Sequence, residues 1–116
     1  MESARDLLAE AARSGRRLRE AIPDVYDAYK AQHSAALDGD GQLPPRIREL
    51  IALAIAVTKQ CDGCIAAHAR GAAQRGASRE EVAEMLGVAI LMNGGPATVW
   101  GPRAFAAFEE FGDGSD

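Results

Sequence analysis

The sequence has little of what marks several large classes of protein. Only 5% of its 116 residues are aromatic and its net charge is -4, so it has no broad basic surface for a nucleic-acid backbone. Its longest apolar runs have about eight residues, far fewer than the ~20 that span a bilayer. The first 22 residues carry charges throughout and lack the apolar segment of a secretion signal. We therefore expect a cytoplasmic protein that binds neither nucleic acid nor membranes.

Cysteine is also scarce, with two residues in the chain. The cytosol keeps thiols reduced, so two cysteines in an intracellular chain are not expected to form a structural framework. A chain of this length buries roughly two thirds of its unfolded surface, and it needs no disulfide or metal to hold a core. We expect a single domain over residues 1–116, and the spacing of the cysteines becomes the main clue to function.

Alanine, in contrast, is abundant. The chain has 24 alanines, whereas valine, isoleucine and threonine together supply 13 residues, which favours helices over strands. The apolar spacing predicts an all-α bundle of about six helices. We expect these helices over residues 3–22, 23–37, 45–58, 61–75, 78–92 and 96–111. Gly15 marks a weak point in the first helix where a bend is expected, a kink or break is expected near Gly101-Pro102 in the last, and the tail GDGSD is expected to be disordered.

The third predicted helix is apolar nearly all round, which is typical of a helix at the centre of a core. One side repeats at the helical period and Leu53 and Val57 make the other side apolar. The members of the first side are Ile47, Leu50, Ile51, Ala54, Ile55 and Thr58. Trp100 and the three phenylalanines are read as core or subunit contacts.

The two cysteines form the motif Cys61-Asp62-Gly63-Cys64 at the start of a predicted helix. Backbone N–H groups and the dipole at a helix N-terminus stabilise a thiolate, which is the nucleophilic form of cysteine. The two-residue gap also lets the sulfurs meet, so a product of attack on one can be resolved by the other as a disulfide. Two alternatives remain open, namely small buried cysteines without chemistry and half of a metal site.

His68 and Glu49 extend the motif in both directions. His68 follows Cys64 by four residues, so both lie on one helix face, where an imidazole can take the proton of a thiol. Glu49 precedes Cys61 by twelve residues and borders an uncharged stretch, where a partly buried carboxylate would orient the histidine. The alternatives are a histidine packed without a task, and a surface salt bridge between Glu49 and Arg46, which spacing alone favours.

This combination resembles a known family. A glutamate, a CxxC motif twelve positions on and a histidine four after its second cysteine are together specific for the AhpD-like alkyl hydroperoxidases of the carboxymuconolactone decarboxylase superfamily. The likeness covers about residues 43–111 and includes the later turn Asn93-Gly94-Gly95-Pro96. One departure stands at Gly63, where the best-known hydroperoxidases of the family carry a second histidine.

The resemblance implies an AhpD-like helical fold and a catalytic role for four residues. Cys64 would be the peroxidatic thiol, Cys61 the resolving thiol, and His68 and Glu49 the proton relay that activates Cys64. It further implies a hydroperoxide substrate, a thioredoxin-like or lipoyl dithiol as external reductant, no bound cofactor or metal, and assembly into a homo-oligomer such as a trimer or hexamer.

Three other readings of the sequence are weighed against this one. The first is thiol–disulfide exchange without peroxide reduction, and the second is a small-molecule-binding member of the superfamily. The third is a metal-binding module that uses Cys61, Cys64 and His68, with Glu49 as a further candidate ligand, although a structural zinc site usually needs a second ligand pair. His33 is read as a surface or groove histidine, and Asp38 and Asp40 as solvated turn residues.

Overall fold

A computed structural model describes residues 3–112, and within that range it contains six α-helices and no strand. The helices are α1 (Ala4–Ala21), α2 (Pro23–Leu37), α3 (Pro45–Lys59), α4 (Asp62–Gln74), α5 (Arg79–Asn93) and α6 (Gly95–Gly112). The predicted all-α class, the number of helices and most of their boundaries are confirmed.

The boundaries follow from local signals in the sequence. Pro23 and Pro45 stand in the first turns of α2 and α3, where a missing N–H costs no intrahelical bond. Ser78 caps α5 by accepting a hydrogen bond from the Glu81 N–H at 3.0 Å, and the Glu81 carboxylate accepts one from the Ser78 N–H at 2.9 Å. The predicted capping box is therefore present.

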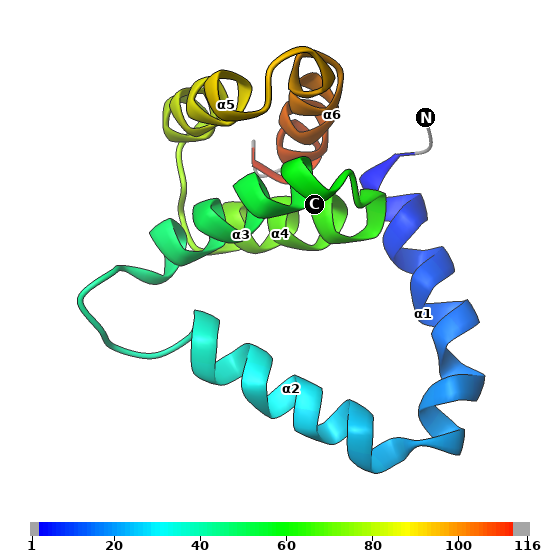
Figure 1. Cartoon of the computed structure of the whole chain (residues 1–116). Helices are drawn as coiled ribbons and strands as arrows, with labels where there is room; N and C mark the ends of the chain where they lie inside the picture. Colours follow the sequence, from blue (N-terminus) through cyan, green and yellow to red (C-terminus); the bar gives the residue numbers. More distant parts are fainter. Residues whose placement is uncertain (1–2, 113–116) are drawn as a thin grey trace.

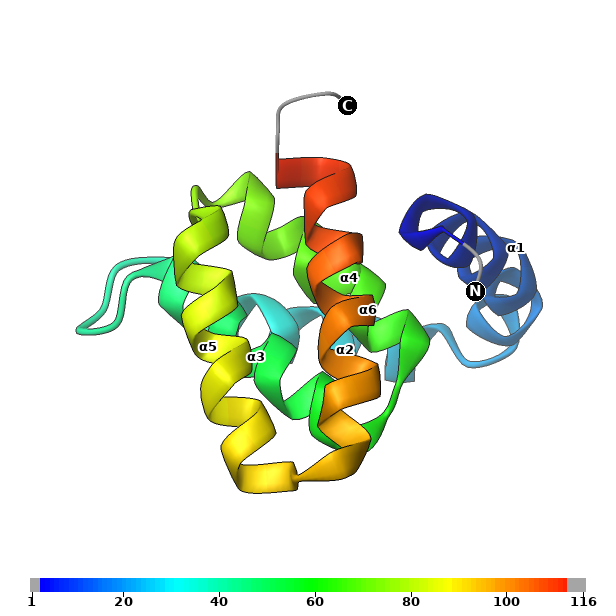
Figure 2. The same ribbon diagram turned by 90° about the horizontal axis from the view of Figure 1, so that it is seen from above.

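Helices α3 to α6 form a bundle, and α1 and α2 leave it as a V-shaped arm (Figures 1 and 2). Helix α4 packs extensively against α3, α6 and α1, so it lies at the centre of the molecule. Its inward face carries small side chains such as Ala66 and Ala69, which let neighbouring helices approach closely. The largest fully buried apolar side chains are Phe108, Leu53, Ile65, Val57 and Val82.

The expectation that α3 is buried on all sides is wrong. Its inward face is covered by α4 and α6, but Ile51 and Ile55 are 47% and 50% exposed. With Val88 and Met92 of α5 they line an open apolar groove of about 440 Å³. Apolar composition alone does not show whether a side chain is buried within its own chain or exposed on its surface.

The break expected in the last helix is also absent, since α6 runs through Pro102 without interruption. The proline ring faces solvent, where water can satisfy the carbonyl that loses its partner, while Gly101 and Ala104 on either side are buried and hold the helix against its neighbours. Phe108 and Phe111 are buried, which confirms the aromatic core. Helix α1 likewise continues through Gly15. Apart from Gly112, the predicted irregular tail lies outside the described residues.

Candidate active site

The turn between α3 and α4 places both cysteines at the start of a helix. Gln60 ends α3 in the left-handed conformation with a φ of 55°, and the Cys61 N–H donates to the Ala56 carbonyl at 3.2 Å. Cys61 has an extended backbone and is the N-cap of α4. The CxxC motif therefore occupies the first turn of the central helix, as the sequence predicts.

Cys61 and Cys64 are joined by a disulfide in this structure. The Cys61 sulfur also accepts a hydrogen bond from the Cys64 N–H at 3.2 Å, one of the otherwise unpaired donors of the helix N-terminus. Cys64 is exposed to solvent, whereas Cys61 is half-buried. Between them, one carboxylate oxygen of Asp62 is buried without a hydrogen-bond partner among the described residues. Cys64 is thus the more exposed residue of the pair.

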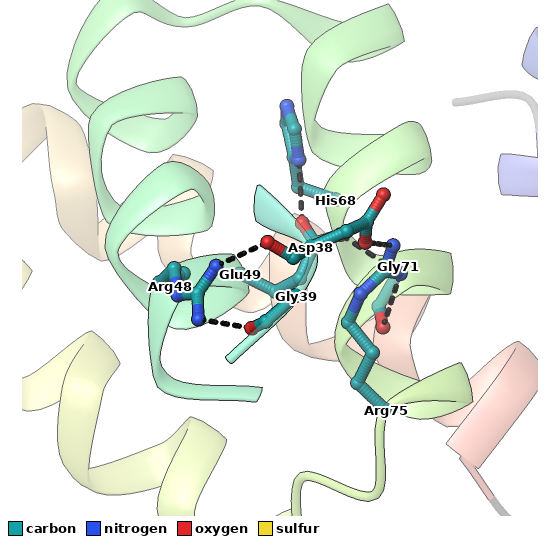
Figure 3. Close-up of polar contacts among 7 residues, drawn as sticks. All are labelled: Asp38, Gly39, Arg48, Glu49, His68, Gly71 and Arg75. Atoms are coloured by element: carbon teal, nitrogen blue, oxygen red, sulfur yellow. Dashed lines mark hydrogen bonds and ion pairs between the residues drawn. The ribbon is translucent and has the colours of Figure 1, made fainter. Parts of the chain in front are cut away.

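Glu49 and His68 meet across the interface of α3 and α4. The Glu49 Oε1 atom lies 2.7 Å from the His68 Nδ1 atom, and the Glu49 side chain is only 2% exposed (Figure 3). A carboxylate accepts the proton of Nδ1, which fixes the orientation of the ring and leaves Nε2 to exchange protons with a reacting group. His68 stands one helical turn after Cys64, on the same face of α4.

A glycine makes room for the buried carboxylate. A Cβ atom at position 71 would overlap the carboxylate of Glu49, so Gly71 is required for α3 and α4 to approach at this point. Cys64, His68 and Gly71 recur every three or four residues along one face of α4, which presents the cysteine, the histidine and the space for the Glu49 carboxylate in order.

The second oxygen of Glu49 has its own cationic partner. The Arg75 Nη1 atom lies 3.1 Å from Oε2 of Glu49, and the Nη2 atom lies 2.5 Å from Oδ1 of Asp38 (Figure 3). The hydrogen bond from Arg75 lowers the pKa of Asp38, and the same bond raises the pKa of Arg75. Arg75 thereby supplies a positive charge to one oxygen of the buried Glu49 carboxylate, while the other oxygen bonds the His68 ring.

The carboxyl end of α2 is anchored over this network. The Arg48 guanidinium donates to the backbone carbonyls of Asp38, Gly39 and Leu43 at distances of 2.8, 2.6 and 2.9 Å. Arg48 from α3 and Arg75 from the end of α4 thereby hold the segment that follows α2 (Figure 3). This anchoring fixes the position of α2 although few of its side chains are buried.

Anchored in this way, α2 brings His33 onto the site. The rings of His33 and His68 are stacked, with centroids 5.8 Å apart and an interplanar angle of 15°. The ring of Tyr29, one turn earlier on α2, is tilted against that of His33, with centroids 6.2 Å apart. The structure thus adds His33 to the candidate site, whereas the sequence indicated only a position at the surface or in a groove.

The sequence pattern of the carboxymuconolactone decarboxylase family matches residues 23–111. The chain belongs to this family. An uncharacterized protein of Cupriavidus necator is 40% identical over 92 residues, covering 79% of this chain and 80% of the relative. An uncharacterized protein of the cox locus of Paracoccus denitrificans is 35% identical over 110 residues, covering 95% and 92%.

A solved structure shows the same fold. The crystal structure of an apo carboxymuconolactone decarboxylase family protein from Legionella pneumophila matches with a TM-score of 0.88 and 36% identity, covering 94% of this chain and 96% of that one. The similarity extends over nearly the whole chain. The superfamily expected from the spacing of Glu49, the CxxC motif and His68 is therefore confirmed.

In this family member, one reading of a single residue proves wrong. Glu49 does not pair with Arg46, whose Nε atom instead lies 3.1 Å from Glu81 on α5. The error arises from reading neighbours along one helix, whereas the actual partners lie on other elements of the fold. Asp38 is exposed in the turn after α2, as expected, and Arg75 in addition links it to Glu49.

Residues 3–112 contain neither a metal-binding cluster nor a membrane-spanning helix. No three histidine, cysteine or acidic side chains gather there in a way that would hold a metal ion. None of the six helices has both the length and the apolar character needed to cross a membrane.

Proposed function

We propose that this protein is a thiol-dependent hydroperoxide reductase. The observation that carries the proposal is the pair Cys61–Cys64 in the first turn of α4, with His68 one turn further on and held by the buried Glu49. A nucleophile, a base and a group that orients the base are the parts that thiol chemistry requires. The disulfide is the oxidised product that a peroxidatic and a resolving cysteine would form.

Each step of the proposed cycle balances. His68 takes the proton of the Cys64 thiol, and the thiolate attacks the O–O bond of the hydroperoxide. A sulfur–oxygen bond forms, the alcohol leaves with the proton from His68, and Cys64 becomes a sulfenic acid. The Cys61 thiol then displaces water and forms the disulfide. An external dithiol, thioredoxin-like or lipoyl in class, supplies two electrons and two protons to restore both thiols.

The electrostatic setting supports Cys64 as the attacking thiol. It is exposed, its position in the first turn of α4 favours a negative charge, and the dipole of the helix acts on it directly. Glu49 acts through His68, since it is buried and touches the ring rather than the sulfur. In this proposal Cys61 is the resolving thiol, and the reducing cytoplasm supplies the dithiol. The cycle needs no bound cofactor or metal.

The test is the fate of both thiols when the reduced protein meets one equivalent of an organic hydroperoxide. Intact mass and a free-thiol count should show rapid loss of both thiols in the parent and none in Cys64→Ser. In Cys61→Ser a sulfenic acid should persist and react with a dimedone trap. His68→Gln should slow the loss by about 10²-fold, as expected when a general base is removed. Full turnover in Cys64→Ser would disprove the proposal.

Thiol–disulfide exchange is the second candidate, favoured by the formed disulfide and the exposed Cys64. It predicts that dithiols reduce the pair rapidly while hydroperoxides oxidise it no faster than a free cysteine. The same free-thiol count, run with a disulfide in place of the hydroperoxide, separates the two candidates.

We also propose that the chain assembles into a homo-oligomer such as a trimer or hexamer. Ile51 and Ile55 of α3 and Val88 of α5, together with the neighbouring Leu91 and Met92, are 47–79% exposed around the apolar groove. Contiguous apolar surface of this kind is typical of a subunit contact. Light scattering coupled to gel filtration should give a mass above 12.2 kDa, and a monomer at all concentrations would contradict this.

A further inference from the structure

A cavity of about 830 Å³ lies beside the site, between the arm and the central helix. Its lining residues come from α1, α2 and α4, whose arrangement is shown in Figure 1. Its walls are Ala11, Ala12, Arg19, Tyr26, Asp27, Tyr29, Lys30, His33, Ala67 and Arg70. Its volume is within the range of small-molecule sites, roughly 300–1,000 Å³.

The cavity shares its wall with the catalytic face of α4. Ala67 follows Cys64 by three residues and directly precedes His68, and residues three apart on a helix have Cβ atoms about 5–6 Å apart. On the opposite wall, His33 is stacked on the ring of His68. A molecule in the cavity would therefore lie within one helical turn of the reactive sulfur.

The charge of the cavity is opposite to that of the whole chain. Arg19, Lys30 and Arg70 line it against the single carboxylate of Asp27, although the chain carries a net charge of -4. No ion pair joins any of the three cations to a described carboxylate. The Arg19 guanidinium lies 5.4 Å from the centre of the Tyr26 ring, which leaves its hydrogen-bond donors available. Such a cluster attracts an anion against the field of the rest of the protein.

We propose that this cavity binds the organic part of the substrate and selects hydroperoxides that carry a carboxylate. The proposal rests on the hydroperoxide reductase function and names the substrate class of that same site. Tyr26 and Tyr29 contact the carbon skeleton, and the cations hold the carboxylate. The peroxide group then lies at the Ala67 end of the cavity, toward Cys64.

The experiment compares a charged substrate with its neutral methyl ester, which is larger by one methyl group. The reduced full-length protein is mixed with 4-carboxycumene hydroperoxide or with its methyl ester, and the second-order rate constant of thiol loss is measured. The acid should react faster than the ester by about tenfold, the lower end of the electrostatic enhancement for a charged cleft. In Arg70→Gln and in Arg19→Gln the ratio of the two rate constants should fall by about fivefold. An equal rate for acid and ester overturns the proposal.

Arg16→Gln is the matched control for Arg19→Gln. Arg16 lies one turn earlier on the same helix and is exposed, but it does not line the cavity, and its substitution changes the net charge by the same amount. The ratio of rate constants should stay at the parent value in this variant. A fall as large as that in Arg19→Gln would mean that the charge of the whole protein, and not the cavity, favours the acid.

A ligand without a peroxide group separates this proposal from the proposed function. Titration calorimetry with 4-isopropylbenzoate should show saturable binding to the parent and binding about fivefold weaker in Arg70→Gln. If neither hydroperoxide oxidises the thiols but the benzoate binds in this way, the reductase function is wrong and the anion site stands. If the benzoate does not bind, or binds Arg70→Gln equally well, the anion site is wrong whatever the thiols do.

Discussion

Each of the two faces of α3 carries an exception to the usual distribution of polar and apolar residues. On the inward face, the charged side chain of Glu49 is 2% exposed, whereas Ile51 and Ile55 on the outward side are about half exposed. The inward carboxylate is stable because His68 and Arg75 each bond one of its oxygens. The outward isoleucines are covered only in part by the described residues. The comparison separates one buried polar side chain beside the candidate site from exposed apolar side chains suited to association.

The largest effect is expected when the inward carboxylate is removed. Glu49→Ala leaves a void beside Gly71 and deprives both His68 and Arg75 of a buried partner. We expect the free energy of unfolding to fall by about 3 kcal/mol, measured by urea denaturation. Thiol oxidation by hydroperoxide should slow in parallel, because the His68 ring loses its orientation. Glu49→Gln keeps the shape of the side chain and should lose about half as much stability, and an equal loss would contradict the role of shape.

A smaller effect on the same face is expected from Gly71→Ala. The added methyl group overlaps the Glu49 carboxylate, and displacing it should cost about 2 kcal/mol of unfolding free energy and slow thiol oxidation. Gly87→Ala in α5 is the control, since open space surrounds that position and alanine favours a helix by about 0.5–1 kcal/mol. If Gly71→Ala gains stability as Gly87→Ala does, then α3 and α4 do not approach each other at position 71 as closely as the structure indicates.

The pH dependence of stability tests the ion pair between Arg75 and Asp38, at the exposed edge of the contacts around Glu49. The hydrogen bond from Arg75 lowers the pKa of Asp38 below its ordinary value of 3.8 in the folded state. Its stabilising contribution is therefore complete above 3.8 and is lost as the pH falls through the folded value. The urea midpoint of the parent should exceed that of Asp38→Asn near neutrality, and the difference should shrink in acid. A difference that grows in acid would mean that the carboxylate is not stabilised by Arg75.

The smallest effect on the stability of the single chain is expected on the outward face. Ile55→Ser should change the unfolding free energy by no more than about 0.5 kcal/mol when both proteins are dilute enough to be monomeric. Light scattering at higher concentration should nevertheless show a lower mass than for the parent. A parent that is oligomeric and a variant of equal mass would place the subunit contact elsewhere.

Much of the fold could be predicted because residues close to the helix ends in the sequence determine where each helix begins. Pro23, Pro45 and the Ser78–Glu81 pair act within one helical turn, and local sequence carries such signals completely. Which side of α3 is buried could not be predicted in the same way. Both of its sides are apolar, so the outcome depends on where α4 and α5 pack.

The residues of the candidate site also fall into two groups, those that the local sequence indicates and those that depend on how distant elements pack. The spacing of Glu49, the CxxC motif and His68 led to the family and to four residues that the fold brings together. His33 and Asp38 could not be found from spacing, because each reaches the network through the placement of α2. That placement depends on Arg48 and Arg75, which bond the end of α2 from two other helices.

The short spacing of the two cysteines limits how much their disulfide can stabilise the fold. Cys61 and Cys64 are three residues apart, so the bond closes a very small ring. A cross-link restricts the unfolded chain in proportion to the logarithm of the loop that it closes, and this loop is among the shortest possible. The bundle therefore does not need the bond to stay folded. A bond that is dispensable for architecture would be free to be broken and remade in the catalytic cycle that we propose.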